Sequence, residues 1–600
     1  MSNSRVEFKE RAVIIDGRKT QIIAGAMHYF RVPREYWRDR MEKAVQLGLN
    51  CIETYMCWNL HERKEGTYDF SGMLDFENFI RSAHELGLYV IVRPGPYICS
   101  EWDNGGIPSW LMNKSGIRYR RMNKPYIDAL TTYLNVIIPK LKALQYDDGG
   151  PIIAMQIENE YGSYSCDKTY LAYLRDLYRN AGISIPLFTA DGIEFGNPNK
   201  LLMINGGTID GAAMCLNFGS RGIEGFDLGK TVRPDDPPFC TEFWCGWFDA
   251  WGCGTHHTRS PQNAAEELDD MLAYGGNVDF YMFHGGTNFA FTAGANGTNN
   301  KDYAPDVTSY DFDAILSEAG DPTEKFFAIQ NVIRKYAPDR KFGTPVPVRK
   351  LPSQRLNITA IAPLHDNLNN IAQKVSDPSP LTFEELGQDF GYVFYRTFVP
   401  GPKRGSFKLQ QVRDRANVYF NGELFHTYYR NDDESYTPTR EFGPEGATLE
   451  LLVENLGRIN YAHLVGRDNK GICGDVAFAW QILVDWEMWA LPSDSAPDEK
   501  LDWKPFQTLL RGKPAYYLVE FDVEDPADAF LKFPGIHGGV WLNGHAIGRY
   551  WDIGPGSTLY LPGAWMKKGK NRLIIFETDK LIKPYIDILD HPELNEKIKV

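Results

Sequence analysis

The chain has 600 residues and a formal net charge of -14, with no dense run of lysine and arginine. Because nucleic-acid backbones are bound through clustered basic side chains, this composition argues against a nucleic-acid partner. At about 150 residues per domain, the length predicts two to four domains, one of which can be a large barrel.

The N-terminal segment MSNSRVEFKERAVIID has no apolar stretch of the signal-peptide type, and no run of 18 apolar residues occurs. The nine cysteines are scattered and form no CxxC pair, which is typical of reduced thiols. We therefore expect a cytoplasmic protein without a membrane partner. The composition does not decide whether the protein forms a homo-oligomer.

Residues 20 to 340 alternate short β-rich runs with segments of helical period. The eight expected strands begin at Gln21, Cys51, Tyr89, Ile152, Leu187, Leu202, Phe239 and Val278. Helical segments from Pro33, Leu74 and Lys168 each end at a glycine, as helices commonly do. This order predicts an α/β fold, a catalytic (β/α)₈ TIM barrel over residues 1–340. The rival, a doubly wound open sheet, lacks its usual glycine-rich fingerprint after the first strand.

The remainder of the chain has short alternating strands separated by Gly, Pro and Asn turns, a pattern typical of antiparallel sandwiches and jelly rolls. Two similar stretches, ANVYFNGE from Ala416 and GGVWLNGH from Gly538, each end an apolar run in an Asn-Gly hairpin signal. We expect a jelly-roll-like β-rich segment over 341–500 and a second jelly-roll domain over 501–600, with strands that the two can share.

Polar residues follow several expected barrel strands at their C-terminal ends, the face on which barrel enzymes build their sites. They are Tyr55, Glu101, Asn159, Glu160, Asp191 and Glu242. Glu160 and Glu242 have aromatic neighbours in sequence, and an aromatic wall can stack on a sugar ring while raising the pKa of a carboxyl group. Retaining glycoside hydrolysis needs one carboxylic acid and one carboxylate about 5 to 5.5 Å apart. A single glutamate here would more often be a salt-bridge partner, but the pair favours glycosidase chemistry.

Three further features have simpler interpretations. The adjacent His256 and His257 lack a clear metal-ligand spacing, so we predict no metal and no cofactor. The segment GGTNF from Gly285 has no nearby basic residue, which favours a tight turn that lets backbone approach a neutral ligand over a phosphate loop. Period-two alternation places Glu158 deeper than Glu160 on the same side of the strand, as a buried partner for an arginine such as Arg93.

The segment GGPIIAMQIENEY from Gly149 matches the signature of the glycoside hydrolase family 35 β-galactosidases, and the chain resembles that family over nearly its full length. Other similar blocks are RPGPYICSEWDNGGIPSWL, TEFWCGWFDAWG, MFHGGTNF and, in the β-rich half, GRINYAHLVGRDNKGI. The resemblance implies a retaining exo-enzyme that removes terminal non-reducing β-D-galactosyl residues from oligosaccharides or glycoconjugates.

The resemblance also assigns roles to residues. It implies Glu160 as general acid/base and Glu242 as the nucleophile that forms the glycosyl-enzyme. Tyr55, Cys99, Glu101, Asn159 and Tyr310 would bind the galactose. The β-rich half is similar to the family's galactose-binding-like domains, which we expect to brace the barrel or shape the pocket rim more than to bind sugar.

Two segments depart from the family pattern. SYDFDAI from Ser309 stands where members frequently read SYDYDAP, so Phe312 replaces a tyrosine whose hydroxyl contact is then absent or supplied by Tyr310 or another group. AFTAGANGTNN from Ala290 lacks the family's aromatic-rich text. Two alternatives therefore stay open: the same mechanism on another β-glycoside such as a β-glucosaminide, and a carbohydrate-binding protein without catalysis.

Overall fold

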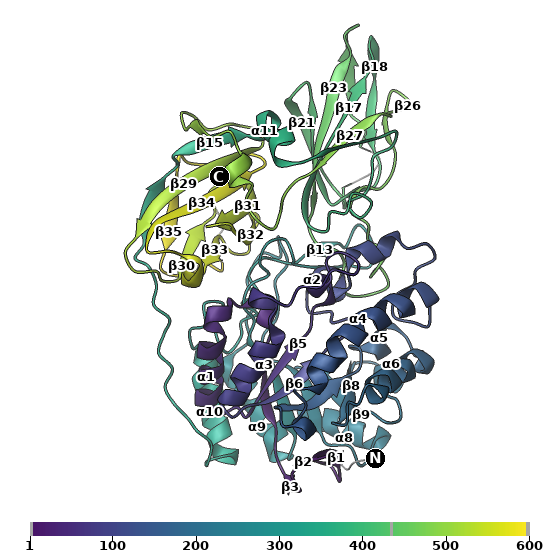
Figure 1. The fold of residues 1–600 in the computed structure, drawn as a ribbon, viewed down its shortest axis with the longest axis vertical. Coiled ribbons are helices and arrows are strands. Elements are labelled where there is room, and N and C mark those ends of the chain that lie inside the picture. The colour runs from purple at the N-terminus through teal and green to yellow at the C-terminus, as the bar shows by residue number, and fades with distance from the viewer. Residues whose placement is uncertain (1–3, 433–435, 596–600) are drawn as a thin grey trace.

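The computed structural model describes residues 4–432 and 436–595. The N-terminal half forms a barrel, and the β-rich half sits beyond one end of it as two sandwiches (Figure 1). Within those residues, no helix is both long enough and apolar enough to cross a bilayer.

The eight parallel strands close into a barrel in the order β10-β11-β4-β5-β6-β7-β8-β9. Their bounds are β4 Ile23–Met27, β5 Cys51–Tyr55, β6 Tyr89–Arg93, β7 Ile152–Gln156, β8 Leu187–Gly192, β9 Ala213–Phe218, β10 Phe239–Trp244 and β11 Asn277–His284. The strands are apolar because both of their faces are covered. The predicted TIM barrel is confirmed.

The strand predicted from Leu202 is wrong. Residues Leu202–Gly207 form the short helix α7, and the sixth barrel strand is β9, with the sequence AMCLNF. A four-residue apolar run does not distinguish a strand from a helix segment by period alone. The error matters for the site, because β9 carries Asn217 near its C-terminal end.

Helices cover the outside of the barrel (Figure 1). They are α1 Trp37–Leu47, α3 Phe76–Glu85, α4 Lys124–Lys142, α6 Lys168–Asn180, α8 Gly222–Val232, α9 Pro261–Ala273 and α10 Glu324–Tyr336. Two short helices, α2 Trp58–His61 and α5 Tyr161–Tyr164, follow the C-terminal ends of β5 and β7, and α2 lies at the barrel end toward the sandwiches (Figure 1). The predicted helices correspond to α1, α3 and α6. The α6 helix begins where the Asp167 side chain accepts from the backbone N–H groups of Thr169 and Tyr170, which caps its free donors.

A small antiparallel sheet closes the barrel end opposite the β-rich half (Figure 1). Its strands are β1 Val6–Lys9, β2 Ala12–Ile15 and β3 Arg18–Lys19. Val6, Val13 and Ile15 are buried in one apolar cluster with barrel residues such as Ile91 and Ile153. This end is therefore packed, and the open face of the barrel is the one toward the sandwiches.

The first sandwich pairs a six-stranded sheet with a four-stranded sheet. The larger sheet has β16 Lys374–Asp377, β27 Trp486–Ala490, β17 Gly391–Val399, β23 Ala447–Asn455, β20 Arg415–Phe420 and β21 Glu423–Tyr429. The smaller has β22 Thr439–Phe442, β18 Lys403–Leu409, β25 Val476–Phe478 and β26 Gln481–Ile482, and β19 Val412–Arg413 pairs separately with β24 Gly471–Ile472.

The second sandwich repeats this arrangement. Its larger sheet has β28 Lys504–Pro505, β15 Ala360–Pro363, β29 Ala515–Val523, β34 Gly569–Glu577, β31 His537–Leu542 and β32 His545–Trp551. Its smaller sheet has β14 Gln354–Asn357, β35 Tyr585–Leu589, β30 Ala529–Lys532 and β33 Thr558–Leu561. Strands β14 and β15 precede the first sandwich in sequence, and the helix α11 Leu364–Ile371 follows them.

The two Asn-Gly signals form the expected hairpins, β20–β21 and β31–β32. At Asn421 and Gly422 φ is 50° and 76°, and at Asn543 and Gly544 it is 50° and 91°. Two-residue turns of this kind need left-handed backbone at both positions, which Asn and Gly adopt at low cost. A short two-stranded sheet in the barrel loops, β12 Ala295–Asn296 with β13 Ala304–Pro305, lies near the junction with the sandwiches (Figure 1).

Candidate active site

A cavity of about 270 Å³ opens at the C-terminal ends of the barrel strands. Six of the residues predicted from the sequence line it together: Tyr55, Cys99, Glu101, Asn159, Glu160 and Glu242. Its wall also includes Ser100, Trp244, Trp247, Tyr281, Asn296 and Tyr461. The strands and loops thus bring two carboxyl groups and several aromatic rings to one concave surface.

Glu242, at the end of β10, receives three hydrogen bonds. Its Oε1 accepts from the Tyr55 hydroxyl at 2.8 Å and from Arg93 Nη2 at 2.7 Å. Its Oε2 accepts from Trp244 Nε1 at 3.1 Å. A carboxylate that accepts from a guanidinium and two further donors is stabilised in its ionised form and fixed in orientation.

Glu160 has a contrasting environment. Its Oε1 accepts only from Asn217 Nδ2, at 3.2 Å, among the described residues. Burial raises the pKa of Glu160 to about 8, and the negative charge of Glu242 adds to the effect. Asn217 was not found from the sequence, because the strand that carries it was misplaced. The signal was present in the apolar run 213–216 that ends in an asparagine.

Glu158 does not pair with Arg93, as the sequence analysis expected. Its carboxylate accepts from Arg120 Nε at 3.0 Å and Arg120 Nη2 at 2.8 Å. The strand β7 ends at Gln156, and φ is positive at both Glu158 (62°) and Glu160 (45°), so strand alternation no longer applies there. Arg93 is consequently free to contact Glu242.

Asn159 lies between these two glutamates in sequence, and its amide is oriented by the same groups that hold the nucleophile candidate. Its Oδ1 accepts from Arg93 Nη2 at 2.9 Å and also lies 2.9 Å from the Tyr55 hydroxyl, whose single proton it shares with Glu242. Its Nδ2 makes one long contact, 3.4 Å to the Ile98 carbonyl. The amide N–H groups are therefore the part of Asn159 that can donate to a ligand hydroxyl.

Glu101 belongs to a turn in which Cys99, Ser100 and Glu101 all have left-handed backbone, with φ of 55°, 61° and 49°. Burial raises the pKa of Glu101 to about 7, against a hydrogen bond from the Tyr310 hydroxyl that favours the ionised form. Tyr310, predicted to bind the sugar, lies beside Glu101 and is not on the cavity wall. Its effect on a ligand therefore passes through Glu101.

Phe312 lines the cavity, with its ring centroid 5.4 Å from that of Tyr281. Phe312 has no hydroxyl to offer, and the tyrosine hydroxyl that donates to Glu242 is that of Tyr55. The glycines of GGTNF serve packing: a Cβ at Gly285 would lie 1.8 Å from the Tyr310 carbonyl oxygen, and one at Gly286 would lie 2.4 Å from that of Arg31. Residues 285–289 are not among those that line the cavity, and the approach of this turn to a ligand stays a prediction.

Asp191, the penultimate residue of β8, is not among the residues that line the cavity. Its Oδ1 accepts from the backbone N–H of Gly162 at 2.6 Å, in the helix α5 that begins directly after Glu160. Burial raises the pKa of Asp191 to about 7, against this hydrogen bond. Asp191 therefore helps to hold the segment that carries Glu160.

The first sandwich supplies part of the site wall through the segment after β23. Arg458 forms an ion pair with Asp103, Nη1 to Oδ2 at 3.0 Å, and its backbone N–H donates to the other oxygen at 2.7 Å. Asn460 accepts from the Tyr97 hydroxyl at 2.6 Å, and Tyr461 lines the cavity. These contacts tie the sandwich to the barrel loop that carries Cys99 and Glu101.

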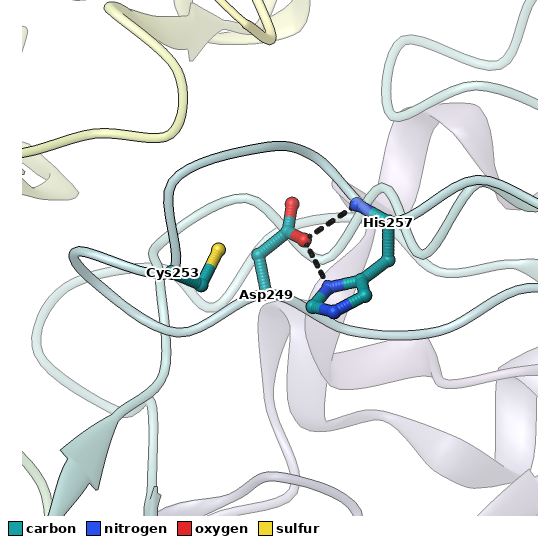
Figure 2. A group of neighbouring side chains, drawn as sticks. All are labelled: Asp249, Cys253 and His257. Atoms are coloured by element: carbon teal, nitrogen blue, oxygen red, sulfur yellow. Dashed lines mark hydrogen bonds and ion pairs between the residues drawn. The ribbon is translucent and has the colours of Figure 1, made fainter.

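Asp249, Cys253 and His257 form a group whose candidate ligand atoms lie within 4.8 Å of one another (Figure 2). The Asp249 carboxylate already contacts His257, Oδ1 to Nδ1 at 2.8 Å and to the backbone N–H at 2.9 Å. Its Oδ2 contacts His256 Nδ1 at 2.6 Å. Burial opposes a charged His256, but hydrogen bonds to Asp249 and Asp311 outweigh it and raise the pKa of His256 to about 10. These hydrogen bonds explain why the three side chains lie close together: Asp249 holds the loop that carries His256 and His257.

The family model described as glycosyl hydrolases family 35 matches residues 12–336. Models for a first all-beta domain and a galactose-binding domain, both described under beta-galactosidase, match residues 380–492 and 514–571. The chain belongs to glycosyl hydrolases family 35. It is a glycoside hydrolase, and the strands that carry its cavity lie within the residues matched by the family model.

Curated relatives are similar over almost the whole chain. The "Beta-galactosidase" of Bos taurus is 40% identical, over 93% of this chain and 88% of its own length. That of Homo sapiens is 38% identical, over 96% and 87%. The "Beta-galactosidase-1-like protein 3" of Rattus norvegicus is 38% identical, over 97% and 91%.

Proposed function

We propose that the protein is a retaining, exo-acting β-galactosidase that hydrolyses terminal non-reducing β-D-galactosyl residues by double displacement. The observation that carries the proposal is the unlike environment of two carboxyl groups on one cavity. Glu242 has three donors, whereas Glu160 has a single amide donor and a raised pKa. Such unlike environments assign the two groups different roles: the carboxyl group with the raised pKa is the acid, and the one that accepts from a guanidinium is the nucleophile.

In the first step Glu242 attacks the anomeric carbon while Glu160 gives its proton to the glycosidic oxygen. The bond from the anomeric carbon to that oxygen breaks, the bond to the Glu242 oxygen forms, and the aglycone leaves as an alcohol. Asn159 lines the cavity, and we expect its Nδ2 to donate to the sugar 2-hydroxyl, an interaction that strengthens at the transition state.

In the second step water attacks the same carbon, and Glu160 accepts its proton as general base. The bond to Glu242 breaks, which restores the carboxylate. While Glu242 is esterified its negative charge is gone, and that charge is one cause of the raised pKa of Glu160. Glu160 therefore becomes more acidic at the point in the cycle where it must be ionised.

Galactose as the sugar is supported by the relatives, whose printed names are beta-galactosidase. Phe312 favours a second candidate, the same mechanism on another β-glycoside such as a β-glucosaminide, because it removes a hydroxyl from the cavity wall. A panel of nitrophenyl β-glycosides separates the two. We expect the largest kcat/KM for the galactoside, and a ratio that favours the glucosaminide would reject galactosidase activity.

The pH dependence of kcat/KM tests the mechanism independently of the sugar. Glu242 must be ionised and Glu160 protonated, so activity falls on both sides of an optimum. We expect the alkaline limb near pH 8, where Glu160 loses its proton. A flat profile between pH 5 and 9 would reject the acid/base pair.

A further inference from the structure

Two carboxyl groups lie inside the barrel beneath the cavity, and the mechanism above does not use them. Glu53 is on β5, two residues before Tyr55, and Asp279 is on β11, two residues before Tyr281. Both are fully buried. Because side chains alternate along a strand, they lie one layer below the two tyrosines of the cavity wall.

Neither group has the partners that a buried carboxylate requires. All four oxygens of Glu53 and Asp279 are without a hydrogen bond among the described residues. Arg93 is the only cation of the described chain within ion-pair distance of Glu53, at 3.8 Å, and none is that close to Asp279. Arg93 lies closer to Glu242, at 2.7 Å.

The charges in this part of the barrel therefore do not balance if every acid is ionised. Arg93 compensates Glu242, and two further carboxylates would leave a net charge of about -2 in a fully buried layer, at a cost of several kcal/mol per ion. The other ionisable groups around the pair are Tyr55 and Cys51 on β5 and Cys240 on β10. None of these supplies a positive charge.

We propose that Glu53 and Asp279 are positioning residues, a layer of protonated carboxylic acids that supports Arg93 from below and leaves its whole charge for Glu242. A protonated carboxyl occupies the space under the guanidinium without competing for it. The Nη1 group of Arg93 has no hydrogen-bond partner among the described residues, so the guanidinium is held chiefly by contacts on its other nitrogens. A second carboxylate below Arg93 would draw it from the nucleophile.

The direction of the pKa values agrees with this geometry. Burial raises the pKa of Glu53 to about 8; Arg93 opposes the shift and Glu242 adds to it. Burial also raises the pKa of Asp279 well above its ordinary range, with Glu53 as the next cause. Glu53 is thus mostly protonated below about pH 8, and the direction for Asp279 is the same.

Stability gives a test that does not depend on activity. The folded-state pKa of Glu53 is above the unfolded value of about 4.3, so its protonation stabilises the fold fully below pH 4.3 and that contribution is lost as pH rises through 8. Glu53→Gln cannot lose a proton. We expect its Tm relative to wild type to rise with pH from about 5 to 8, by about 2 to 4 °C in total. Asp279→Asn should behave in the same way.

Asp468→Asn is the matched control, because its partners are lysine and arginine. Burial opposes ionisation of Asp468, but Lys470, Arg430 and Arg413 outweigh it and lower its pKa to about 2. Its stabilising effect is lost only below the unfolded pKa of about 3.9, so the Tm deficit of Asp468→Asn should be constant between pH 5 and 8. A Tm difference for Glu53→Gln that is equally constant would overturn the proposal.

The kinetic test rests on the proposed function, because it uses Glu242 as nucleophile. Glu53→Gln should retain kcat/KM near the optimum pH within about threefold. Glu53→Ala removes support from Arg93, so its kcat should fall by about tenfold or more. The acid limb of Glu53→Gln should coincide with that of wild type. If Glu53 were ionised, its removal would shift that limb to lower pH, which would overturn the proposal even if Glu53→Ala fails to fold.

Failure of the proposed function would abolish the nucleophile's limb in wild type but leave the Tm result unchanged.

Discussion

Buried carboxyl groups occur in two regions of this molecule, and the two regions treat them differently. At the junction between barrel and first sandwich, Asp414 contacts Lys470 at 2.7 Å and Arg430 at 2.9 Å. Burial there opposes ionisation of Asp468, but Lys470 and Arg430 outweigh it and lower its pKa to about 2. Every charge at this junction has an opposite charge beside it.

In the barrel mouth, pairing is incomplete. Glu160 has one amide donor, and Glu53 has a single distant cation. The pKa values of both are raised, whereas the junction carboxylate Asp468 has a lowered one. Complete pairing of charges stabilises the contact between the domains. Incomplete pairing of Glu160 favours its protonated form, which the proposed acid step requires.

The largest loss of activity should follow removal of Glu242, the carboxylate that accepts three hydrogen bonds. Glu242→Ala leaves Arg93 and Tyr55 in place but removes the attacking oxygen. We expect kcat on nitrophenyl β-galactoside to fall by about 10⁴-fold or more. Equal turnover by wild type and variant, with both chains folded by circular dichroism, would contradict the nucleophile assignment.

A smaller loss should follow removal of the incompletely paired acid. Glu160→Gln should lower kcat/KM by about 10² to 10⁴-fold on substrates with poor leaving groups. The loss should shrink on a dinitrophenyl glycoside, because that aglycone departs without a proton. The alkaline limb near pH 8 should also vanish, and its persistence in the variant would assign that limb to another group.

The junction should affect activity least, and mainly through stability. Arg458→Met leaves Asp103 buried and unpaired, which costs about 3 to 5 kcal/mol in the free energy of unfolding. The loop with Cys99 and Glu101 loses a tether, so we expect kcat/KM to fall about tenfold as well. Denaturant titration and assays at low temperature measure the two effects.

Arg549→Met is the control for that prediction. Arg549 forms a comparable buried pair with Glu454, at 2.6 Å, within the sandwiches. It should lose similar stability while kcat/KM per folded molecule stays near wild type. Equal activity loss in both variants would show that the barrel loop has no special dependence on Arg458.

The sequence predicted the barrel because seven of its eight strands are distinct apolar runs. It predicted that Glu160 and Glu242 share one face because both lie at the ends of such runs, and both line the cavity; their catalytic roles stay a prediction. The predictions that failed concern contacts between residues distant in sequence, which the pattern of apolar and polar residues does not specify. Glu158 pairs with Arg120, distant in sequence, since left-handed backbone turns it away from Arg93. Tyr461 reaches the cavity from another domain, and nothing local to it marks a barrel site.

Tyr310 shows the same limit of the sequence pattern. Its hydroxyl donates to Glu101, which is distant in sequence, and its predicted contact to the sugar stays a prediction. Asn217 escaped notice because a four-residue run at Leu202 was a stronger apolar signal than its own strand. The separation of Glu160 and Glu242, expected at about 5 to 5.5 Å, stays a prediction.

The most direct test of the account is to identify the residue that becomes glycosylated. Incubation with a 2-fluoro-galactosyl donor that has an activated leaving group, followed by peptide mass spectrometry, reads this out. The account predicts inactivation with one fluorogalactosyl group on Glu242. Label on another residue, or full turnover without any adduct in a folded enzyme, would contradict the claim that Glu242 is the nucleophile of a retaining mechanism.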